Sequence, residues 1–235
     1  GFALQCDPKE IMSMLEKANV PLDLWAVKEH MQNCGDLDQI TECALLISAA
    51  NEGHLLEIQY HELPCGRKVA VGGYTIQHMP RWLREIALKG YWDYDFQNCH
   101  YVIASTYGNF PYIQRYVTNT SQIRQEIAEG SNDTEKGVKL ALLSLLYGAR
   151  QVSNEYTALG QHLGEKAAEK VLENDFVRGL LEDIANLVPI LLKEAEEHPE
   201  IIGDTASVCS QMLMMKESEM LWVATKGVEN PILMF

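Results

Sequence analysis

Apolar residues recur every three or four positions along most of the chain, which is the spacing of amphipathic helices. The third such stretch is typical, because Leu37, Ile40 and Ala44 would lie on one face. By this pattern we expect one helix that begins at Asp7-Pro8 and further helices over 21–33, 36–50, 80–90, 98–108, 111–117, 121–128, 134–147 and most of 155–226, with breaks near Pro189, Pro199 and Gly203.

Four shorter segments either alternate between apolar and polar residues or form short apolar runs, and both patterns are typical of strands. They cover 54–61, 67–71, 91–96 and 231–235. Few strands beside many helices favour a single α+β unit. We expect a small antiparallel sheet with the helices packed mainly on one of its faces.

The charge of the chain is strongly negative but unevenly distributed. Its 235 residues include 33 acidic and 19 basic side chains, which give a formal net charge of −14. This excess argues against a protein that coats nucleic acid in general. Half of the excess lies in 165–204, however, whereas 64–124 holds 7 bases against 3 acids. The middle of the chain is therefore locally basic, which the total charge conceals.

Targeting signals are absent from the sequence pattern. No run of about 18 apolar residues predicts a membrane span, and the first residues do not form a signal peptide. Six scattered cysteines without a CxxC pair favour reduced thiols inside a cell, and we do not expect secretion. The first residue is not Met and the last apolar run, NPILMF, stops abruptly, so we expect both ends to be cut from a longer polypeptide.

An acidic pair lies between aromatic residues in the segment WDYDFQNCHY, 92–101. Asp93 and Asp95 are two positions apart on an expected strand, so both would project from one face. Carboxylates where a strand leads into a helix are natural ligands for Mg²⁺, which takes oxygen ligands and shares them with substrate phosphates. The alternative is that these acids cap the following helix or pair with an arginine.

A second segment, KLALLSLLYG, spans 139–148 on an expected helix. Lys139 and Tyr147 are eight residues apart, a little over two turns, and would share a face. The lysine can meet a triphosphate as a point charge, and Gly148 after the tyrosine permits close approach of another group. The alternative is a surface lysine, a core tyrosine and a glycine that ends the helix.

Together the two segments resemble template-directed right-hand polymerases. DFQNCHY is similar to motif A in the form used by family B, and KLALLSLLYG is similar to motif B with the spacing of family A. Their separation of about 45 residues suits a palm followed by fingers. The combination resembles divergent polymerase-like proteins of viruses and plasmids, over 66–148. The resemblance implies a palm-like sheet and template-directed nucleotidyl transfer, with a DNA polymerase favoured.

For the metal site, the resemblance implies that Asp95 is the ligand of motif A and that the backbone carbonyl of Phe96 is a second contact to the ion. We expect Asp93 to join them, and the ion to be Mg²⁺ or Mn²⁺.

For the nucleotide, the resemblance implies that His100 is a sugar gate beneath the ribose. Lys139 would hold the triphosphate and act in the transfer, together with the metal ligand Asp95. Tyr147 and Gly148 would lie near the nascent base pair.

Two departures from the family pattern stand out. The second metal carboxylate, motif C, is expected just after the last strand, where this chain stops at Phe235. We therefore expect the 235-residue chain alone to be inactive, because it holds one half of the metal site. Family A also carries an arginine four residues before the motif B lysine, where this chain has Glu135. Lys136 and Arg150 are the candidate substitutes.

The resemblance also implies partners: a nucleic-acid template and primer, a nucleoside triphosphate and the remaining C-terminal part of the parent polypeptide, in a host-cell interior. Arg81 and Arg84 share a helix face and are candidates for template or primer phosphates, with a solvated face as the alternative. Glu217 and Glu219, on the last expected helix, are predicted to lie on a solvated face, with one of them facing the metal region as the alternative.

The expected organisation is an N-terminal helical region 1–53, a palm segment 54–110, fingers-like helices 111–160 and a helical return to the palm 161–235. Two other functions compete with the polymerase. One is a catalytically degenerate helical interaction module, which the acidic C-terminal helices favour. The other is a metal-dependent nuclease that would use Asp93, Asp95 and His100.

Overall fold

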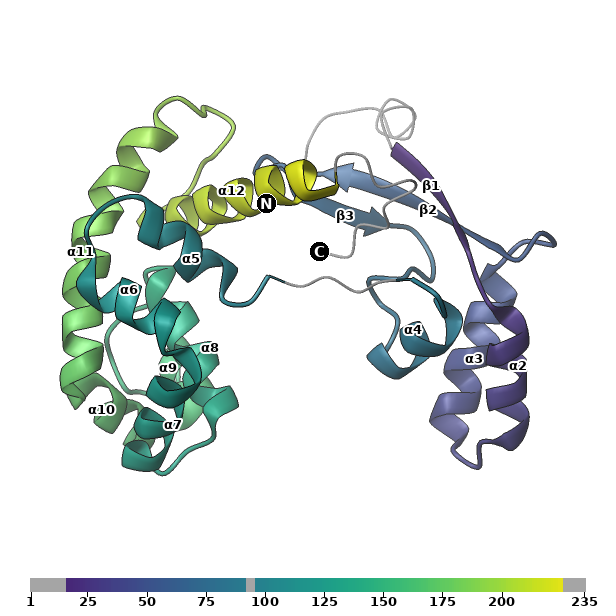
Figure 1. Cartoon of the computed structure of the whole chain (residues 1–235), viewed down its shortest axis with the longest axis horizontal. Helices are drawn as coiled ribbons and strands as arrows, with labels where there is room; N and C mark the ends of the chain where they lie inside the picture. Colours follow the sequence, from purple (N-terminus) through teal and green to yellow (C-terminus); the bar gives the residue numbers. More distant parts are fainter. Residues whose placement is uncertain (1–15, 92–95, 226–235) are drawn as a thin grey trace. The chain divides into compact units, whose positions relative to one another are not determined.

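The computed structural model describes residues 16–91 and 96–225, and these form an α+β fold with eleven helices and one three-stranded antiparallel sheet (Figure 1). The helix expected from Asp7-Pro8, the acidic pair Asp93 and Asp95 with most of its strand, and the expected strand 231–235 lie outside the described residues. The described part divides into two compact units. We call them the sheet unit, 16–63 with 67–91, and the helical unit, 64–66 with 96–224.

The sheet unit contains the strands β1 (Glu16–Pro21), β2 (Leu55–Glu62) and β3 (Lys68–Val71), in the order β1-β2-β3. Both pairings are antiparallel. Along β2, alternate residues are buried, including Leu56, Ile58 and Tyr60, whereas Glu57 and His61 are exposed. One face of the sheet therefore carries the core, as the alternating pattern predicted.

Helices α2 (Leu24–Asn33), α3 (Leu37–Ala49) and α4 (Arg81–Ala87) supply the rest of this core. Asp23 and Asp36 cap the first two, because their carboxylates accept hydrogen bonds from backbone N–H groups of the first turn. The core of the sheet unit includes Val20, Val27, Cys43, Leu46, Leu56, Ile58, Ile76 and Leu83. Within this unit the helices thus cover one face of the sheet, as expected.

Strand β1 corrects the prediction that only helices precede residue 54. The sequence EKANVP contains good helix formers, but it pairs along β2 from Glu16↔Tyr60 to Pro21↔Leu55. Val20 enters the core, and Lys17 meets Glu57 across the strands at 3.3 Å. Tertiary pairing here overrides local helix propensity. Helices α2 and α3 confirm the prediction for the rest of 24–49.

The helical unit contains α5 (Cys99–Thr106), α6 (Pro111–Thr118), α7 (Thr120–Ser131), α8 (Glu135–Leu146), α9 (Ala158–Leu163), α10 (Glu165–Glu173), α11 (Asp175–Ala195) and α12 (Thr205–Thr225). Figure 1 draws them from teal to yellow in chain order. Each helix from α6 to α11 packs on the one before it in the chain, and α11 also packs on α6. The break expected near Pro199 and Gly203 is present between α11 and α12.

Pro189 does not break α11, in contrast to the prediction. Proline has no backbone N–H, so the carbonyl of Ala185, four residues earlier, has no donor within the helix. Pro189 and Ala185 are both exposed. Water can satisfy that carbonyl on the solvent side, so the helix continues.

Helix α8 forms as its pattern predicts. Val138, Leu142, Leu145 and Leu146 are all buried. The Thr134 side chain caps the helix by accepting a hydrogen bond from the N–H of Gly137 at 3.1 Å. The segment that resembles motif B therefore belongs to a well-packed helix.

No helix within 16–91 and 96–225 combines the length and apolar character needed to cross a bilayer. Among the described cysteines, Cys43, Cys65, Cys99 and Cys209 are buried and Cys34 is partly exposed. Burial raises the pKa of the Cys43 and Cys209 thiols.

An ion pair between Glu194 of α11 and Lys216 of α12, at 2.8 Å, gives the helical unit a pH-dependent stability. Burial alone would raise the pKa of Glu194, but its hydrogen bond from Lys216 and the lysine charge hold this pKa below its ordinary value. A carboxyl pKa that is lowered by folding stabilises the fold above the unfolded pKa, and the contribution is lost as the pH falls through the folded pKa.

Lys216→Met should therefore cost about 1 kcal/mol of unfolding free energy near neutral pH and progressively less below the ordinary carboxyl range. Urea unfolding at a series of pH values measures this cost. Lys166→Met, which removes an exposed lysine of α10, is the control. A cost for Lys216→Met that stayed constant into acid would contradict the assignment.

Candidate functional site

His100 and Tyr147 bring the two recognisable segments of the sequence into contact. His100 lies in the first turn of α5, and Tyr147 caps the C-terminus of α8. The Tyr147 hydroxyl is hydrogen-bonded to Nδ1 of His100. Their rings lie 5.3 Å apart between centroids, at 59°. Residues 47 positions apart in the chain thus form one polar contact inside the helical unit.

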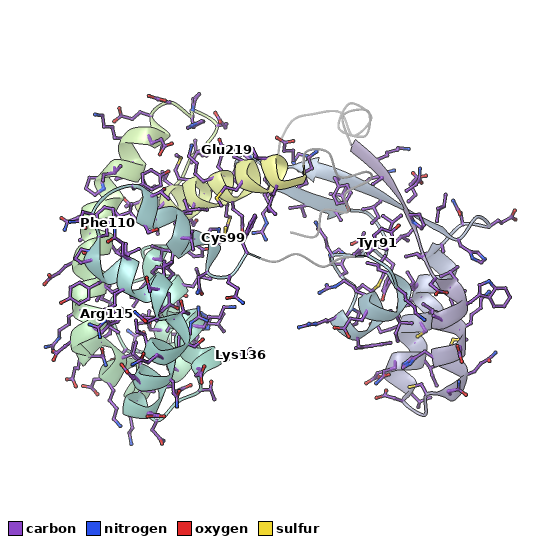
Figure 2. The ribbon with its side chains drawn as sticks, in the orientation of Figure 1. Tyr91, Cys99, Phe110, Arg115, Lys136 and Glu219 are labelled. Atoms are coloured by element: carbon purple, nitrogen blue, oxygen red, sulfur yellow. The ribbon has the colours of Figure 1, made fainter. Side chains whose placement is uncertain are left out.

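Glu217 of α12 contacts the other side of the same imidazole. Its Oε2 lies 3.2 Å from Nε2 of His100, and the exposed fractions of the two side chains are 20% and 10%. The prediction of a solvated face is therefore wrong for Glu217. It is confirmed for the exposed Glu219, labelled in Figure 2, whose carboxylate lies 3.4 Å from Lys216.

The helix that carries His100 is fixed by a buried tyrosine. The Tyr101 hydroxyl donates to the backbone carbonyl of Leu142 in α8 at 2.6 Å, and its ring lies 4.5 Å from that of Tyr116. Burial raises the pKa of Tyr101 well above its ordinary value; Tyr116 contributes to the rise, and the Arg124 charge opposes it. The phenol therefore remains a neutral donor that ties α5 to α8.

The turn before α5 is held by side chains of α7. Asn98 has a left-handed backbone with φ of 52°, which asparagine tolerates better than most residues. Its carbonyl accepts from Arg124, and its amide donates to Thr120 at 2.7 Å. Arg124 also donates to the Tyr116 hydroxyl at 2.7 Å, and no carboxylate among the described residues pairs with it. Nothing in the local sequence pattern indicated this cluster.

Gly148 ends α8 in a left-handed conformation with φ of 83°. Its N–H donates to Leu145, and that of Ala149 donates to Ser144, which is the Schellman arrangement. A Cβ on Gly148 would lie 3.2 Å from Cα of Ala206, at the start of α12. The alternative role of Gly148 as a helix cap is thus confirmed, and the close approach is to protein backbone.

Lys139 is exposed on α8 and makes no hydrogen bond or ion pair with any described residue. It lies roughly 12 Å along the helix axis from Tyr147, at 1.5 Å per residue. The structure thus places both residues on one helix without bringing them into contact. Lys136, a turn earlier and labelled in Figure 2, is also exposed, as is Arg150.

The contacts of the remaining predicted binding residues, Phe96, Arg81 and Arg84, do not indicate a ligand. Phe96 is 37% exposed. In the sheet unit, Arg81 pairs with Glu85 at 2.9 Å, and Arg84 donates to the carbonyl of Met79 at 3.1 Å. These contacts fit the alternative of an ordinary helix face, and the phosphate contact stays a prediction.

The described residues contain no cluster of three or more metal-binding side chains, and the expected metal ligands Asp93 and Asp95 lie outside them. An open depression of about 660 Å³ lies where α7 meets α8. Three carboxylates line it, from Glu129, Asp133 and Glu135. Because they would repel a triphosphate, this depression does not suit the expected nucleotide.

The site is therefore defined by a three-residue contact, His100 with Tyr147 and Glu217. The first two of these residues come from the segments that resemble motifs A and B, whereas Glu217 was expected on a solvated face, because its partner His100 lies 117 residues away in the chain. A scan against protein-family models, a search of curated proteins and a search of solved structures each found no match to this chain.

Proposed function

We propose that this chain carries the nucleotide-binding part of a template-directed nucleotidyl transferase, with a DNA polymerase favoured. The observation that carries the proposal is the contact between His100 and Tyr147. A sugar gate and a residue near the nascent base pair need to be neighbours, because both would face one nucleotide.

The proposed chemistry is attack of a primer 3′-oxygen on the α-phosphate of a nucleoside triphosphate, assisted by two metal ions about 4 Å apart. Asp95, with Asp93, would supply one side of the Mg²⁺ or Mn²⁺ site. Lys139 would hold the phosphates; its exposure and lack of a carboxylate partner in the described part of the chain support this role. The protein would act by positioning and charge stabilisation.

The surroundings of His100 suit a gate. Steric exclusion under a ribose requires a ring that does not swing away, and both ring nitrogens of His100 have hydrogen-bonding partners. The small exposed fraction of its side chain, 10%, also limits alternative rotamers.

The partners would be a template–primer and a nucleoside triphosphate. Arg81 and Arg84 are candidates for nucleic-acid phosphates. The proposed setting is the interior of a host cell, with the protein encoded by a virus or a plasmid.

Nucleotide binding tests the proposal without requiring turnover. Calorimetric titration of the chain with dATP and with ATP, in the presence of MgCl₂, measures both affinities. Lys139→Ala should weaken both by roughly tenfold, since one charge-assisted phosphate contact is lost. Lys170→Ala, which removes an exposed lysine of α10, should leave both unchanged.

His100→Ala should instead change the ratio of the two affinities, because it removes bulk beneath the 2′-carbon and leaves the phosphate contact intact. If Lys139→Ala behaved like Lys170→Ala and His100→Ala left the ratio unaltered, the nucleotide pocket would be abandoned. A helical interaction module would then be the better account of the chain.

A further inference from the structure

Three helices that are distant in the chain contribute one side chain each to a hydrogen-bonded series. Glu217 of α12 contacts Nε2 of His100 in α5, and Nδ1 of the same ring contacts the Tyr147 hydroxyl at the end of α8. The series is thus carboxylate, imidazole, phenol, and it lies entirely within the helical unit.

The chemistry of the two ends restricts the imidazole to one neutral form. An ionised carboxylate only accepts hydrogen bonds, so the ring nitrogen that faces Glu217 must carry a proton. Nδ1 of the neutral ring is then an acceptor, and the Tyr147 hydroxyl donates to it. In the opposite tautomer, the bare Nε2 would face the carboxylate oxygen at 3.2 Å, with two lone pairs opposed.

The burial of His100 and Glu217 strengthens the preference for this tautomer. The side chains of His100 and Glu217 are 10% and 20% exposed, so water competes little for either group. A hydrogen bond to a charged acceptor is stronger than one between neutral groups. Because the proton is fixed on Nε2, Nδ1 is fixed as the acceptor of the Tyr147 hydroxyl.

We propose that Glu217 is a positioning residue, which fixes the tautomer and ring orientation of His100 and thereby directs the Tyr147 hydroxyl. The tautomer part stands on the contacts alone. Its consequence for substrate rests on the proposed function: a ring held in this way would present a fixed edge to the sugar, so Glu217 would set the discrimination between ribo- and deoxyribonucleotides without touching the nucleotide.

The first experiment reads the tautomer directly, in the chain without nucleotide. Long-range proton–nitrogen NMR correlations of the imidazole rings distinguish a protonated from a bare nitrogen, and His100→Gln assigns the signal. The wild-type ring should carry its proton on Nε2. Glu217→Met keeps the side-chain length but removes the acceptor, so the tautomer preference should be lost.

Two further variants separate the positioning role from simple packing. Glu217→Gln retains an acceptor oxygen and should restore the Nε2–H tautomer, whereas a role of side-chain volume alone would not distinguish glutamine from methionine. Tyr147→Phe should also keep the Nε2–H tautomer, because Glu217 is still present. Glu219→Gln, two residues further along α12, should have no effect.

A wild-type ring with its proton on Nδ1, or in rapid exchange between both forms, would overturn the proposal whether or not any variant folds. So would a tautomer that survives in Glu217→Met or that is lost in Tyr147→Phe.

The second experiment measures the substrate consequence by titration with dATP and ATP in MgCl₂. The affinity ratio in Glu217→Met should move severalfold toward that of His100→Ala, and Glu217→Gln should stay near wild type. A changed tautomer with an unchanged ratio would support the positioning role and count against the proposed nucleotide pocket.

Discussion

Asp183→Ala should lower the free energy of unfolding of the helical unit by about 3 kcal/mol, since two backbone donors, one buried and one partly buried, would lose their acceptor. Asp183 is 6% exposed in α11. Its Oδ2 accepts the N–H groups of Tyr112 at 2.6 Å and Ile113 at 3.0 Å. Both belong to the first turn of α6, which begins at Pro111 and whose N-cap residue, Phe110, makes no capping side-chain hydrogen bond. A carboxylate from a distant helix thus supplies the missing cap.

Denaturant unfolding followed by circular dichroism measures the loss. Asp183→Asn should cost less, because one oxygen can still accept a hydrogen bond. Glu182→Ala removes the preceding, exposed carboxylate of α11 and should change stability by less than about 0.5 kcal/mol. Equal effects of Asp183→Ala and Glu182→Ala would refute the trans-helix cap.

Gly160→Ala should destabilise the same unit by on the order of 3 kcal/mol, near the upper end for overpacking. A Cβ on this residue of α9 would lie 1.9 Å from the carbonyl oxygen of Asn154. That carbonyl cannot easily move, because it accepts from both the N–H and the hydroxyl of Thr157, the residue that caps α9. The substitution must therefore separate the loop from the helix.

A second glycine provides the control. Gly130, in α7, has nothing within 4 Å of the position a Cβ would take. Gly130→Ala should therefore stabilise the helix by up to about 1 kcal/mol, which is the ordinary gain in helix propensity. Thermal unfolding of the two variants should show shifts of opposite sign. If Gly160→Ala were as stable as wild type, the close approach of Asn154 would be refuted.

The sequence pattern predicts those helices and strands whose determining residues lie close together in the chain. The apolar face of α8 and its end at Gly148 follow from residue types at helical spacing. Strands β2 and β3 likewise follow from alternation between turn residues. In each case the residues that determine the element lie within it or next to it.

The sequence pattern does not predict structure or contacts that depend on a residue far away in the chain. The sequence of β1 favours a helix until β2 is available as a neighbour. Glu217 looks like any surface acid on α12, because the residue that gives it a role lies 117 positions earlier. Asp183 is similar, since its partners lie about 70 positions away in α6. Such pairings depend on helix packing, which spacing alone does not encode.

The connectivity of the sheet has a consequence for the order in which structure forms. Strand β1 meets β2 only after the chain has passed through α2 and α3, so Val20 and its partner Leu56 are 36 residues apart. Closing a loop of that length costs entropy before any strand contact offsets it. Most helices from α6 to α11 dock instead on the helix just before them, and chains rich in such short-range contacts fold faster. The sheet precedes helices α6 to α11 in the chain, but we expect it to form after them during folding.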